Sequence, residues 1–459
     1  MSTSAPADEA RASSTHTALP APTPISLIDA FWFWLKLGFI SFGGPTGQIA
    51  IMHEELVIRR RWISEQRFLH ALNYCTVLPG PEAQQLATYI GWLLHRTLGG
   101  LVAGGLFVLP SLVILIALSW IYMAYGSVPV FAGIFNGIKP AVTAIVLFAA
   151  FRIGSKALKN AWLWSIAAAA FLGIAVADLP FPLIVAAAAA IGALGGRIRP
   201  DVFRVGGGHG GKHQRVGTAI IDDDTPIPAH ARWSWPVFLR QAAASGALWT
   251  ASLSGIWAAF GWTHPLTQMG WFFTKAALLT FGGAYAVLPY VYQGAVEHYQ
   301  WLTPLQMIDG LALGETTPGP LIMVVTFVGF VGGWTVAPFG SESVGLAGIV
   351  AATRVTFFTF LPSFVFILVG GPWVESTRDN TTFTAPLTAI TAAVVGVILN
   401  LALFFAYHVF WPNGFDGGFA WQATLIGLGA FAALQYGQIS IIRVVLACAA
   451  IGAMRSLLS

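Results

Sequence analysis

The chain has very few charged residues. Asp, Glu, Lys and Arg together make up 9% of its 459 residues, whereas soluble domains carry roughly 25%. Hydrophobic residues reach 56% of the sequence, and the mean hydropathy is +0.72. This composition excludes an ordinary soluble protein, and we expect a protein that is embedded in a lipid bilayer.

Cysteine is also scarce. Cys75 and Cys448 are the two cysteines, and both stand in apolar stretches, which excludes a disulfide framework and favours buried thiols. Residues 1–25 are rich in Ser, Thr, Ala and Pro and lack the apolar core of a cleavable signal peptide. We interpret residues 1–26 as a disordered cytoplasmic tail.

Signatures of enzyme chemistry are missing too. The sequence shows no nucleotide-binding loop between a strand and a helix, no Ser-His-Asp arrangement and no clustered metal ligands in the apolar segments. Residues 197–232 contain three histidines beside Asp222-Asp223-Asp224, but their spacing fits no compact zinc pattern. We therefore prefer a flexible solvated connector to a metal-sensing site. We expect no enzyme, no cofactor, no metal and no nucleic-acid partner.

The chain does contain one pattern twice. Lys36, Ser41-Phe42-Gly43-Gly44, Trp62 and Pro79-Gly80-Pro81 recur 239 positions later as Lys275, Thr280-Phe281-Gly282-Gly283, Trp301 and Pro318-Gly319-Pro320. After one insertion, Leu109-Pro110-Ser111 matches Leu361-Pro362-Ser363 at a spacing of 252. Agreement of Gly, Pro, Trp and Lys at fixed spacing indicates an internal duplication, which is a common architecture of secondary transporters.

The apolar segments predict an all-α polytopic membrane protein with broken helices. A spanning helix needs about 20 mostly apolar residues, and this requirement leads us to expect about ten to fourteen membrane segments. Gly and Pro interrupt the segments 28–44, 68–94 and 269–290, which carry the repeated motifs. We divide the rest of the chain into a first repeat at 27–196, a cytoplasmic Gly-rich basic linker at 197–233, and a linking helix with the second repeat at 234–459.

Charge placement predicts how the two halves are oriented. Residues 51–70 carry four arginines and residues 151–160 carry three basic side chains, whereas the equivalent stretches 290–309 and 403–412 carry neither Lys nor Arg. Short loops rich in Lys and Arg stay in the cytoplasm. Equivalent loops should therefore face opposite sides of the membrane, which predicts an inverted-topology repeat. The four arginines are Arg59, Arg60, Arg61 and Arg67.

The predicted helix breaks favour an anion site. Proline lacks an N–H group and the residue before it avoids helical angles, so each Pro-Gly-Pro should end one helix and start another. In a bilayer, unpaired backbone is tolerated only where it faces protein or a watery cavity. A helix start presents free N–H groups and a positive dipole end, which attract anions. With the two Gly-Gly breaks, four breaks should surround a pseudo-two-fold axis. The alternative is that these glycines allow close helix packing.

Two lysines strengthen the prediction of an anion site. Lys36 and Lys275 each lie in an apolar run about two turns ahead of a Gly-Gly pair, and ionisable side chains inside a membrane are usually functional. A symmetric pair of ammonium groups suits a dianion held between the halves. The alternative is that each lysine snorkels to the nearby membrane interface.

Two carboxylates are candidates for proton coupling. Glu82 follows the first Pro-Gly-Pro and Glu315 precedes the second, at positions that the repeat does not relate. They could titrate and couple proton movement to anion exchange, or they could cap helices or pair with the lysines. Arg354, which has no counterpart in the first half, is a candidate for a gate or a helix end. Side chains that could donate hydrogen bonds to an oxyanion, or could instead form contacts between helices, are Ser41, Gln48, Asn73, Gln84, Gln85, Thr280, Thr316 and Thr317.

These motifs resemble the chromate ion transporter superfamily in its long-chain, two-domain form. The resemblance is carried by the lysine ahead of Ser-Phe-Gly-Gly-Pro, the Trp, Pro-Gly-Pro-Glu and Phe107-Val108-Leu109-Pro110-Ser111, and by their second copies, from about residue 27 to 457. It implies a bacterial inner-membrane protein that exports chromate with the proton gradient and confers chromate resistance. It also implies a path lined by Lys36, Ser41, Gly43, Gly44, Gln48, Pro79, Gly80, Pro81, Lys275, Gly282, Gly283, Thr317, Pro318, Gly319 and Pro320.

The second repeat departs from the first at three positions of the motif, one of which is Leu321, which follows the second Pro-Gly-Pro where Glu82 follows the first. Ala284 replaces Pro45 and Val287 replaces Gln48, so we expect an asymmetric site in which the first half binds more of the anion.

Chromate and sulfate have the same shape and charge, so the choice of chromate as the substrate rests on the resemblance alone. The alternatives are a sulfate or other oxyanion carrier and a membrane anion sensor. The expected partners are the oxyanion, protons, the lipid bilayer and a second copy in a homodimer.

Overall fold

The computed structural model describes residues 24–42, 44–126, 128–203, 218–376 and 384–458. In this part of the chain every regular element is helical, apart from one isolated bridge between Ile63 and Ile221. Within these described ranges, six helices are long and apolar enough to cross a membrane. The chain is therefore an all-α multi-pass membrane protein. The six spans are Glu82–Tyr125, Pro129–Ala157, Phe181–Ile198, Ser341–Ser376, Ala385–Phe410 and Ile441–Leu458.

The first half consists of seven helices and one π-helical turn. In chain order these elements are α1 (Leu27–Ile40), α2 (Gly44–His53), the π turn Glu54–Arg59, α3 (Glu65–Val77), α4 (Glu82–Tyr125), α5 (Pro129–Ala157), α6 (Ala161–Ala175) and α7 (Phe181–Ile198). The connection to the second half contains α8 (Pro200–Phe203), a short turn at Ala229–Ala231 and α9 (Trp235–Phe260).

The second half has the same order of elements. They are α10 (Pro265–Leu278), α11 (Ala284–Tyr292), the π turn Gln293–His298, α12 (Pro304–Thr316), a short turn at Leu321–Met323, α13 (Val324–Val336), α14 (Val344–Ser376), α15 (Thr384–Phe410), α16 (Trp421–Gln435) and α17 (Ile441–Leu458). The long helix α4 corresponds to α13 and α14 together, because α4 is itself two helices joined by a kink at His95 and Arg96.

Unusual backbone features confirm the duplication. The two π turns lie 239 positions apart, and just beyond them Arg61 (φ 52°) and Gln300 (φ 54°) both adopt left-handed angles. Near the end of each half, Asp178 (φ 48°) and Gln438 (φ 49°) repeat the same conformation. Non-glycine residues rarely adopt such angles, so these matches show that the repeat continues through α6 and α7 and through α16 and α17.

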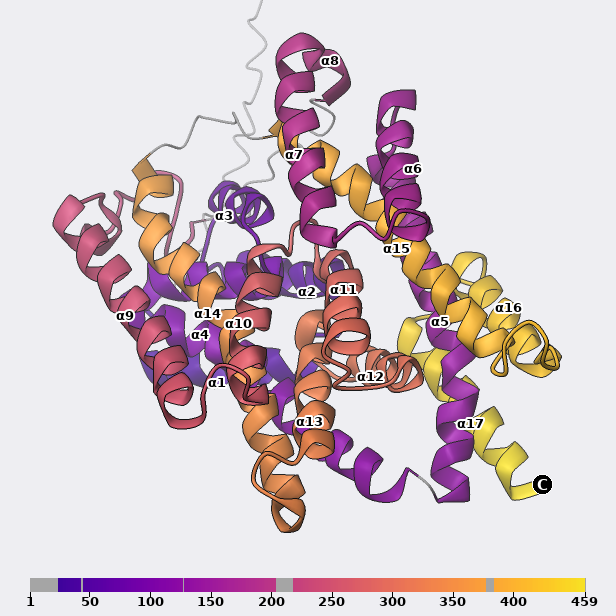
Figure 1. Ribbon diagram of the computed structural model, residues 1–459. Helices are drawn as coiled ribbons and strands as arrows, with labels where there is room; N and C mark the ends of the chain where they lie inside the picture. The colour runs from indigo at the N-terminus through magenta and orange to yellow at the C-terminus, as the bar shows by residue number, and fades with distance from the viewer. Residues whose placement is uncertain (1–23, 43, 127, 204–217, 377–383, 459) are drawn as a thin grey trace, which may run out of the picture.

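Equivalent helices run in opposite directions. In Figure 1, α5 starts at the lower edge and rises, whereas its counterpart α15 starts at the upper edge and descends. Likewise α4 ends at the lower edge and α14 ends at the upper edge, close to α3 and on the same side as α8. This arrangement is the inverted repeat that the distribution of Lys and Arg predicts.

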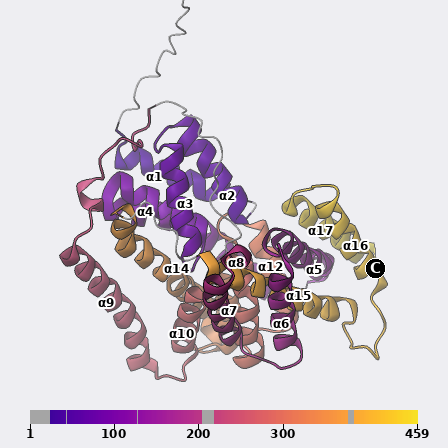
Figure 2. The same cartoon turned by 90° about the horizontal axis from the view of Figure 1, so that it is seen from above.

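The two halves interlock rather than lying side by side. The helices α6 and α7 pack on α15 of the other half, and α16 and α17 pack on α5. Small residues permit this close approach: a Cβ atom added to Gly192 would lie 2.7 Å from the Ala389 Cβ, and one added to Gly452 would lie 2.2 Å from the Gly133 carbonyl oxygen. Figure 2 shows α16 and α17 beside α5, away from α1–α3.

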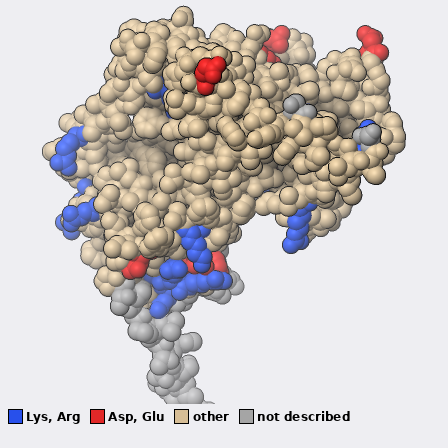
Figure 3. All heavy atoms as spheres, turned by 90° about the horizontal axis from the view of Figure 1, so that it is seen from below, with Lys and Arg blue, Asp and Glu red and all other residues tan. Residues whose placement is uncertain are grey.

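The surface matches a membrane environment. Large apolar side chains such as Trp164, Leu194, Trp235 and Leu446 are exposed, and the face shown in Figure 3 is mostly uncharged, with its Lys, Arg, Asp and Glu side chains mainly near the rim. Exposed apolar area on this scale needs a lipid or protein partner.

The connection between the halves is folded where it is described. The Ile221 N–H donates to the Trp62 carbonyl (3.1 Å), the Ser64 N–H donates to the Ile221 carbonyl (2.9 Å), and the Ile221 side chain is buried against the first half. The expectation of a flexible connector is therefore wrong for residues 218–233, because their isoleucines complete an apolar core. His209 and His213 lie outside the described residues, as do residues 1–23 of the expected tail.

Candidate functional site: a junction of four helix breaks

The four predicted helix breaks are present, and glycine makes them possible. Between α1 and α2, α3 and α4, α10 and α11, and α12 and the Leu321 turn, the chain leaves the helical conformation. The backbone at these breaks has positive φ angles, which only glycine adopts without a steric cost. The glycines concerned are Gly44 (φ 70°), Gly80 (φ 125°), Gly282 (φ 80°), Gly283 (φ 98°) and Gly319 (φ 97°); Gly43 lies outside the described residues.

Two crossed hydrogen bonds bring these breaks together. The Gly80 N–H donates to the Thr280 carbonyl at 2.7 Å, and the Gly319 N–H donates to the Ser41 carbonyl at 2.8 Å. Gly80 and Gly319 are equivalent in the repeat, and so are Ser41 and Thr280. Each Pro-Gly-Pro is therefore bonded to the break of the opposite half. We call this meeting point the junction, and it lies on a pseudo-two-fold axis.

The Leu-Pro-Ser motifs pack against the same point. A Cβ atom added to Gly80 would lie 2.4 Å from the Ser363 Oγ, and one added to Gly319 would lie 2.9 Å from the Ser111 Cβ. Ser111 and Ser363 are equivalent, so each Pro-Gly-Pro glycine touches the serine of the opposite half. The Ser111 Oγ is buried without a hydrogen-bond partner. The sequence shows these serines as repeated residues, but their spacing does not reveal that they reach the junction.

The amide side chains at the junction come from the first half. The Gln48 Nε2 donates to the Gly319 carbonyl at 2.5 Å, and the Gln85 Nε2 donates to the Pro79 carbonyl at 2.8 Å. The side-chain oxygens of both residues, and that of Gln84, are buried without partners. The equivalent positions of the second half are apolar: Val287, Met323 and Val324.

Several helices begin at the junction without a side-chain cap. The residues that precede α4, α11 and the Leu321 turn are Pro81, Gly283 and Pro320, and none of these makes a side-chain capping hydrogen bond. The first N–H groups of a helix have no partner within it. The junction therefore combines backbone donors with the positive ends of helix dipoles.

The hydroxyl groups predicted for the site are already engaged. The Ser41 Oγ donates to the Leu37 carbonyl (2.6 Å), the Thr280 Oγ1 to the Ala276 carbonyl (2.7 Å) and the Thr317 Oγ1 to the Gly314 carbonyl (3.1 Å). These bonds satisfy carbonyls in the last turns of α1, α10 and α12. In this conformation the hydroxyls stabilise the helix ends, and their protons do not point to a ligand.

The two lysines lie in different environments. Lys36 is exposed on the same face of α1 as the exposed side chains of Trp32 and Phe39, which is the placement that snorkelling requires. Lys275 is half-buried, and its ammonium lies 5.7 Å from the centre of the Trp271 ring. Neither lysine makes an ion pair within the described part of the chain, so their role as a clamp stays a prediction.

The two carboxylates also differ. Glu82 is the first residue of α4 and is half-buried, and within the described residues its carboxylate makes neither an ion pair nor a hydrogen bond. Glu315, in the last turn of α12, accepts a hydrogen bond from the Tyr285 hydroxyl of α11. Both residues flank a Pro-Gly-Pro, as the sequence indicates.

Arg354 connects α14 to the linking helix. Its Nε donates to the Leu266 carbonyl at 2.7 Å, its Nη1 donates to the Ser252 carbonyl at 3.3 Å, and its guanidinium lies 4.8 Å from the centre of the Phe358 ring. The contacts stabilise the packing of α9 and α10 on α14. Its role as a gate stays a prediction.

Two buried polar clusters between the halves escaped the sequence analysis. In the first, Arg67 of α3 pairs with Glu375 of α14 at 2.7 Å, and Tyr89 donates to the same carboxylate at 2.5 Å. In the second, Asp309 of α12 contacts Lys139 and Tyr122 of the first half. Asp309 and Lys139 stand in mostly apolar runs, which is a signal that the rarity of intramembrane charges could have exposed.

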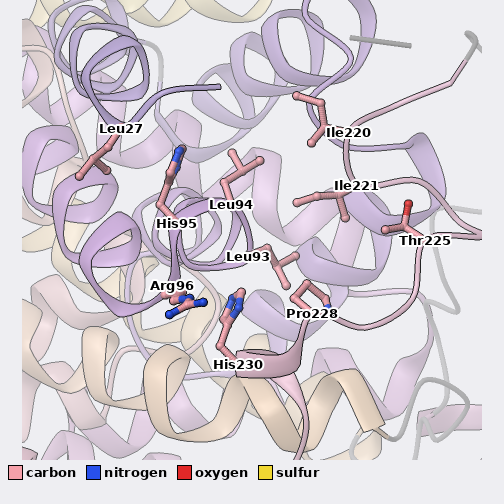
Figure 4. Close-up of a pocket in the computed structure, with 10 residues that line it drawn as sticks. All are labelled: Leu27, Leu93, Leu94, His95, Arg96, Ile220, Ile221, Thr225, Pro228 and His230. Carbon is pink, nitrogen blue, oxygen red and sulfur yellow. The ribbon is translucent and has the colours of Figure 1, made fainter. Parts of the chain in front are cut away.

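A pocket of about 550 Å³ lies between the α4 kink and the connection (Figure 4), apart from the junction residues. The His95 and His230 imidazoles each bond a backbone carbonyl, those of Ile25 and Trp92. Burial lowers the pKa of His230, and nearby Arg96 lowers it further, although the Trp92 carbonyl opposes the shift. His230 therefore contacts the first half in its neutral form.

Comparison with known proteins places both halves in one family. A profile described as Chromate transporter matches residues 28–193 and 267–453. A protein of Cupriavidus metallidurans named chromate transport protein is 28% identical over 409 residues, which cover 88% of each chain. A protein of Pseudomonas aeruginosa with the same name is 34% identical over 384 residues, covering 83% of this chain and 82% of that protein.

A shorter relative illustrates the duplication. A Bacillus subtilis protein named uncharacterized transporter is 27% identical over 171 residues, which cover 37% of this chain and 87% of that protein. No solved structure matches the chain. The profile match over both halves, together with the 34% identity to a chromate transport protein over most of both chains, shows that the chain belongs to the chromate transporter family.

Proposed function

We propose that the protein exports chromate across the bacterial inner membrane in exchange for protons and so confers chromate resistance. The observation that carries this proposal is the junction, where breaks from two inverted halves meet through the crossed Gly80–Thr280 and Gly319–Ser41 hydrogen bonds. Broken helices near a repeat axis are where secondary transporters bind their substrates.

The chemistry of the junction suits an oxyanion. Uncapped starts of α4 and α11 supply backbone N–H groups and positive dipole ends, while Gln48, Gln84 and Gln85 contribute amide groups from the first half. Dissolving the two crossed bonds would free the Gly80 and Gly319 N–H groups for the substrate. The repeated motif residues, including Pro79, Pro318 and Gly282, shape this site.

The choice of chromate is supported by the relatives. Two proteins that share most of the chain are named chromate transport proteins, whereas overall shape and charge do not choose between chromate and sulfate, which are both tetrahedral dianions. Sulfate is therefore the competitor that any transport assay has to include.

We propose that Glu82 and Glu315 couple transport to protons. Both flank a Pro-Gly-Pro, Glu82 makes no ion pair within the described residues, and Glu315 is held by the Tyr285 hydroxyl. A proton bound next to a helix start changes the local charge that the substrate meets. Replacement of either glutamate by Gln should lower gradient-driven chromate transport more than it lowers chromate exchange at equal pH.

Transport in proteoliposomes tests the function. Purified protein is reconstituted, and chromate flux is followed with and without a pH gradient and with sulfate as competitor. The proposal predicts gradient-dependent chromate movement that sulfate barely inhibits. Sulfate flux alone would replace chromate by sulfate as the cargo, and binding without flux would make the protein an anion sensor.

Reporter fusions test the orientation. A reporter fused after Trp62 should read cytoplasmic and one after Trp301 should read periplasmic, because arginines surround the first tryptophan and no Lys or Arg stands near the second. The N-terminal tail would then lie in the cytoplasm. The same side for both fusions would contradict the proposed orientation.

A further inference from the structure

The cluster around Asp309 has a composition and a geometry that packing alone does not explain. The Asp309 side chain is 3% exposed, and its Oδ2 accepts a hydrogen bond of 2.9 Å from the Tyr122 hydroxyl. The Lys139 Nζ lies 3.7 Å from the same oxygen, beyond hydrogen-bond length. The Asp309 Oδ1 is buried and has no hydrogen-bond partner. The oxygens of a buried carboxylate normally accept hydrogen bonds.

The contrast with the Arg67 cluster sharpens this observation. Arg67 and Glu375 are in hydrogen-bond contact at 2.7 Å, and the Arg67 guanidinium also bonds the carbonyls of Asp222 and Thr225. This ion pair is short, and the Arg67 guanidinium donates hydrogen bonds to three acceptors. The Asp309 cluster has the same ingredients, a carboxylate, a cation and a tyrosine, but the carboxylate and the cation are only loosely paired.

The two clusters join the halves at different heights of the molecule. Arg67 lies on α3 and Glu375 in the last turn of α14, and Figure 1 draws α3 and the end of α14 in the upper half of the molecule. Tyr122 lies in the last turn of α4, which ends at the lower edge, and Asp309 lies on α12 of the other half. A carrier that opens alternately to each side must separate its halves at one edge at a time.

We propose that Asp309 is a proton-binding residue and that its protonation opens the contact between α4, α5 and α12 at the edge opposite the connection. This inference rests on the proposed function, to which it adds the element that moves. A proton can bind the Asp309 Oδ1 without displacing an existing hydrogen bond. Once the carboxyl group is neutral, it no longer attracts the Lys139 ammonium, which keeps its hydrogen bond of 3.3 Å to the Asn136 Oδ1.

Few other ionisable side chains lie around Asp309. Among the described residues, Lys139 on α5 and Tyr122 on α4 are the ionisable side chains that act on it, and α13, α15 and α17, which also pack near α12, contribute none. Asp309 stands seven positions before Thr316, where α12 ends at the junction, so about two helical turns connect the proton site to the substrate site.

The direction of coupling follows from this geometry. A proton that enters from the lower edge neutralises Asp309 and opens that edge, where the anion leaves. After closure towards the other side, Asp309 releases the proton there and pairs with Lys139 again. Asp309 binds one proton and releases one proton in each cycle, and Lys139 keeps its charge throughout.

A transport experiment separates a proton site from a structural ion pair. Asp309→Asn should keep chromate exchange at equal pH but lose at least tenfold of the gradient-driven flux, and Asp309→Glu should retain coupling. The double variant Asp309→Asn/Lys139→Met removes both charges and should remain uncoupled. Restored coupling in the double variant would overturn the proposal, because only a structural pair is rescued by removing both partners. Glu342→Gln, at an exposed position, is the control and should behave as the wild type.

A distance measurement tests the same inference without transport. Spin labels at Trp120→Cys on α4 and Leu305→Cys on α12 replace exposed side chains near the cluster. Acidification should lengthen the distance between the labels in the otherwise unchanged protein and leave it constant with Asp309→Asn. A distance between the labels that does not change with pH in the parent protein would overturn the proposal, whichever anion the protein carries. Absence of chromate flux with a pH-dependent distance would instead contradict only the proposed cargo.

Discussion

The two halves contribute the same backbone to the junction but different side chains. Gly80 and Gly319 donate equivalent hydrogen bonds to the opposite half, yet Gln48 and Gln85 of the first half correspond to Val287 and Val324 of the second. The duplication has kept the helix breaks that build the site and has let the side chains diverge. We infer that the breaks define where an anion binds and that the first half defines which anion it is.

The largest expected effect comes from the backbone that both halves share. Gly80→Ala places a Cβ 2.4 Å from the Ser363 Oγ at φ 125°, which costs about 1–3 kcal/mol of stability and should abolish chromate flux. Gly319→Ala should act in the same way. Gly105→Ala on α4, where a Cβ meets nothing within 4 Å, is the control. Thermal unfolding and flux are measured together, and normal flux in Gly80→Ala would contradict an essential junction.

The next effect tests the difference between the halves. Gln48→Val copies the second half into the first and removes the hydrogen bond to the Gly319 carbonyl, so chromate affinity should fall about tenfold, or ~1.4 kcal/mol. Val287→Leu, at the equivalent position, should change affinity little. Equal losses in the two variants, measured by equilibrium binding, would mean that the halves contribute alike.

A smaller effect is expected at the lysines, and it differs between them. Lys275→Gln removes a half-buried ammonium beside Trp271 and should lower flux several-fold, whereas Lys36→Gln changes an exposed position and should leave most of the flux. The assay is initial chromate flux at a fixed pH gradient. Equal and complete loss in both would support a symmetric clamp around the dianion.

The smallest effect concerns the connection. The pKa of His230 is lowered in the folded protein, so the unfolded or detached segment binds a proton first, near the ordinary pKa of about 6.5. The contact of residues 219–231 with the first half should therefore be complete above that pH and weaken as the pH falls through the lower folded value. Hydrogen exchange of this segment should speed up on acidification, and His230→Gln should remove that pH dependence.

The sequence predicts the architecture well because glycine and proline act locally. Pro79-Gly80-Pro81 and Pro318-Gly319-Pro320 end helices whatever surrounds them, and fixed spacing reveals the duplication. The arginines near Trp62 likewise report the inverted orientation, since the asymmetry of Lys and Arg is a property of the sequence itself.

What depends on distant contacts could not be predicted. The meeting of Gly319 with Ser41, the serines at 111 and 363, and the Asp309–Lys139 pair all join residues that are far apart in the chain. The polar, Gly-rich composition of residues 197–232 predicts a flexible connector, whereas isoleucines and backbone hydrogen bonds at Ile221 attach this segment to the first half.

Hydrogen–deuterium exchange with and without chromate tests the junction most directly. Bound chromate should slow exchange of the backbone amides in the segments 80–85 and 319–324, which carry the Pro-Gly-Pro glycines and the helix starts that follow them, and should leave α6 and α16 unchanged. The account predicts this protection at chromate concentrations that saturate binding. Saturated binding with unchanged exchange in both segments would contradict a substrate site built from the crossed helix breaks.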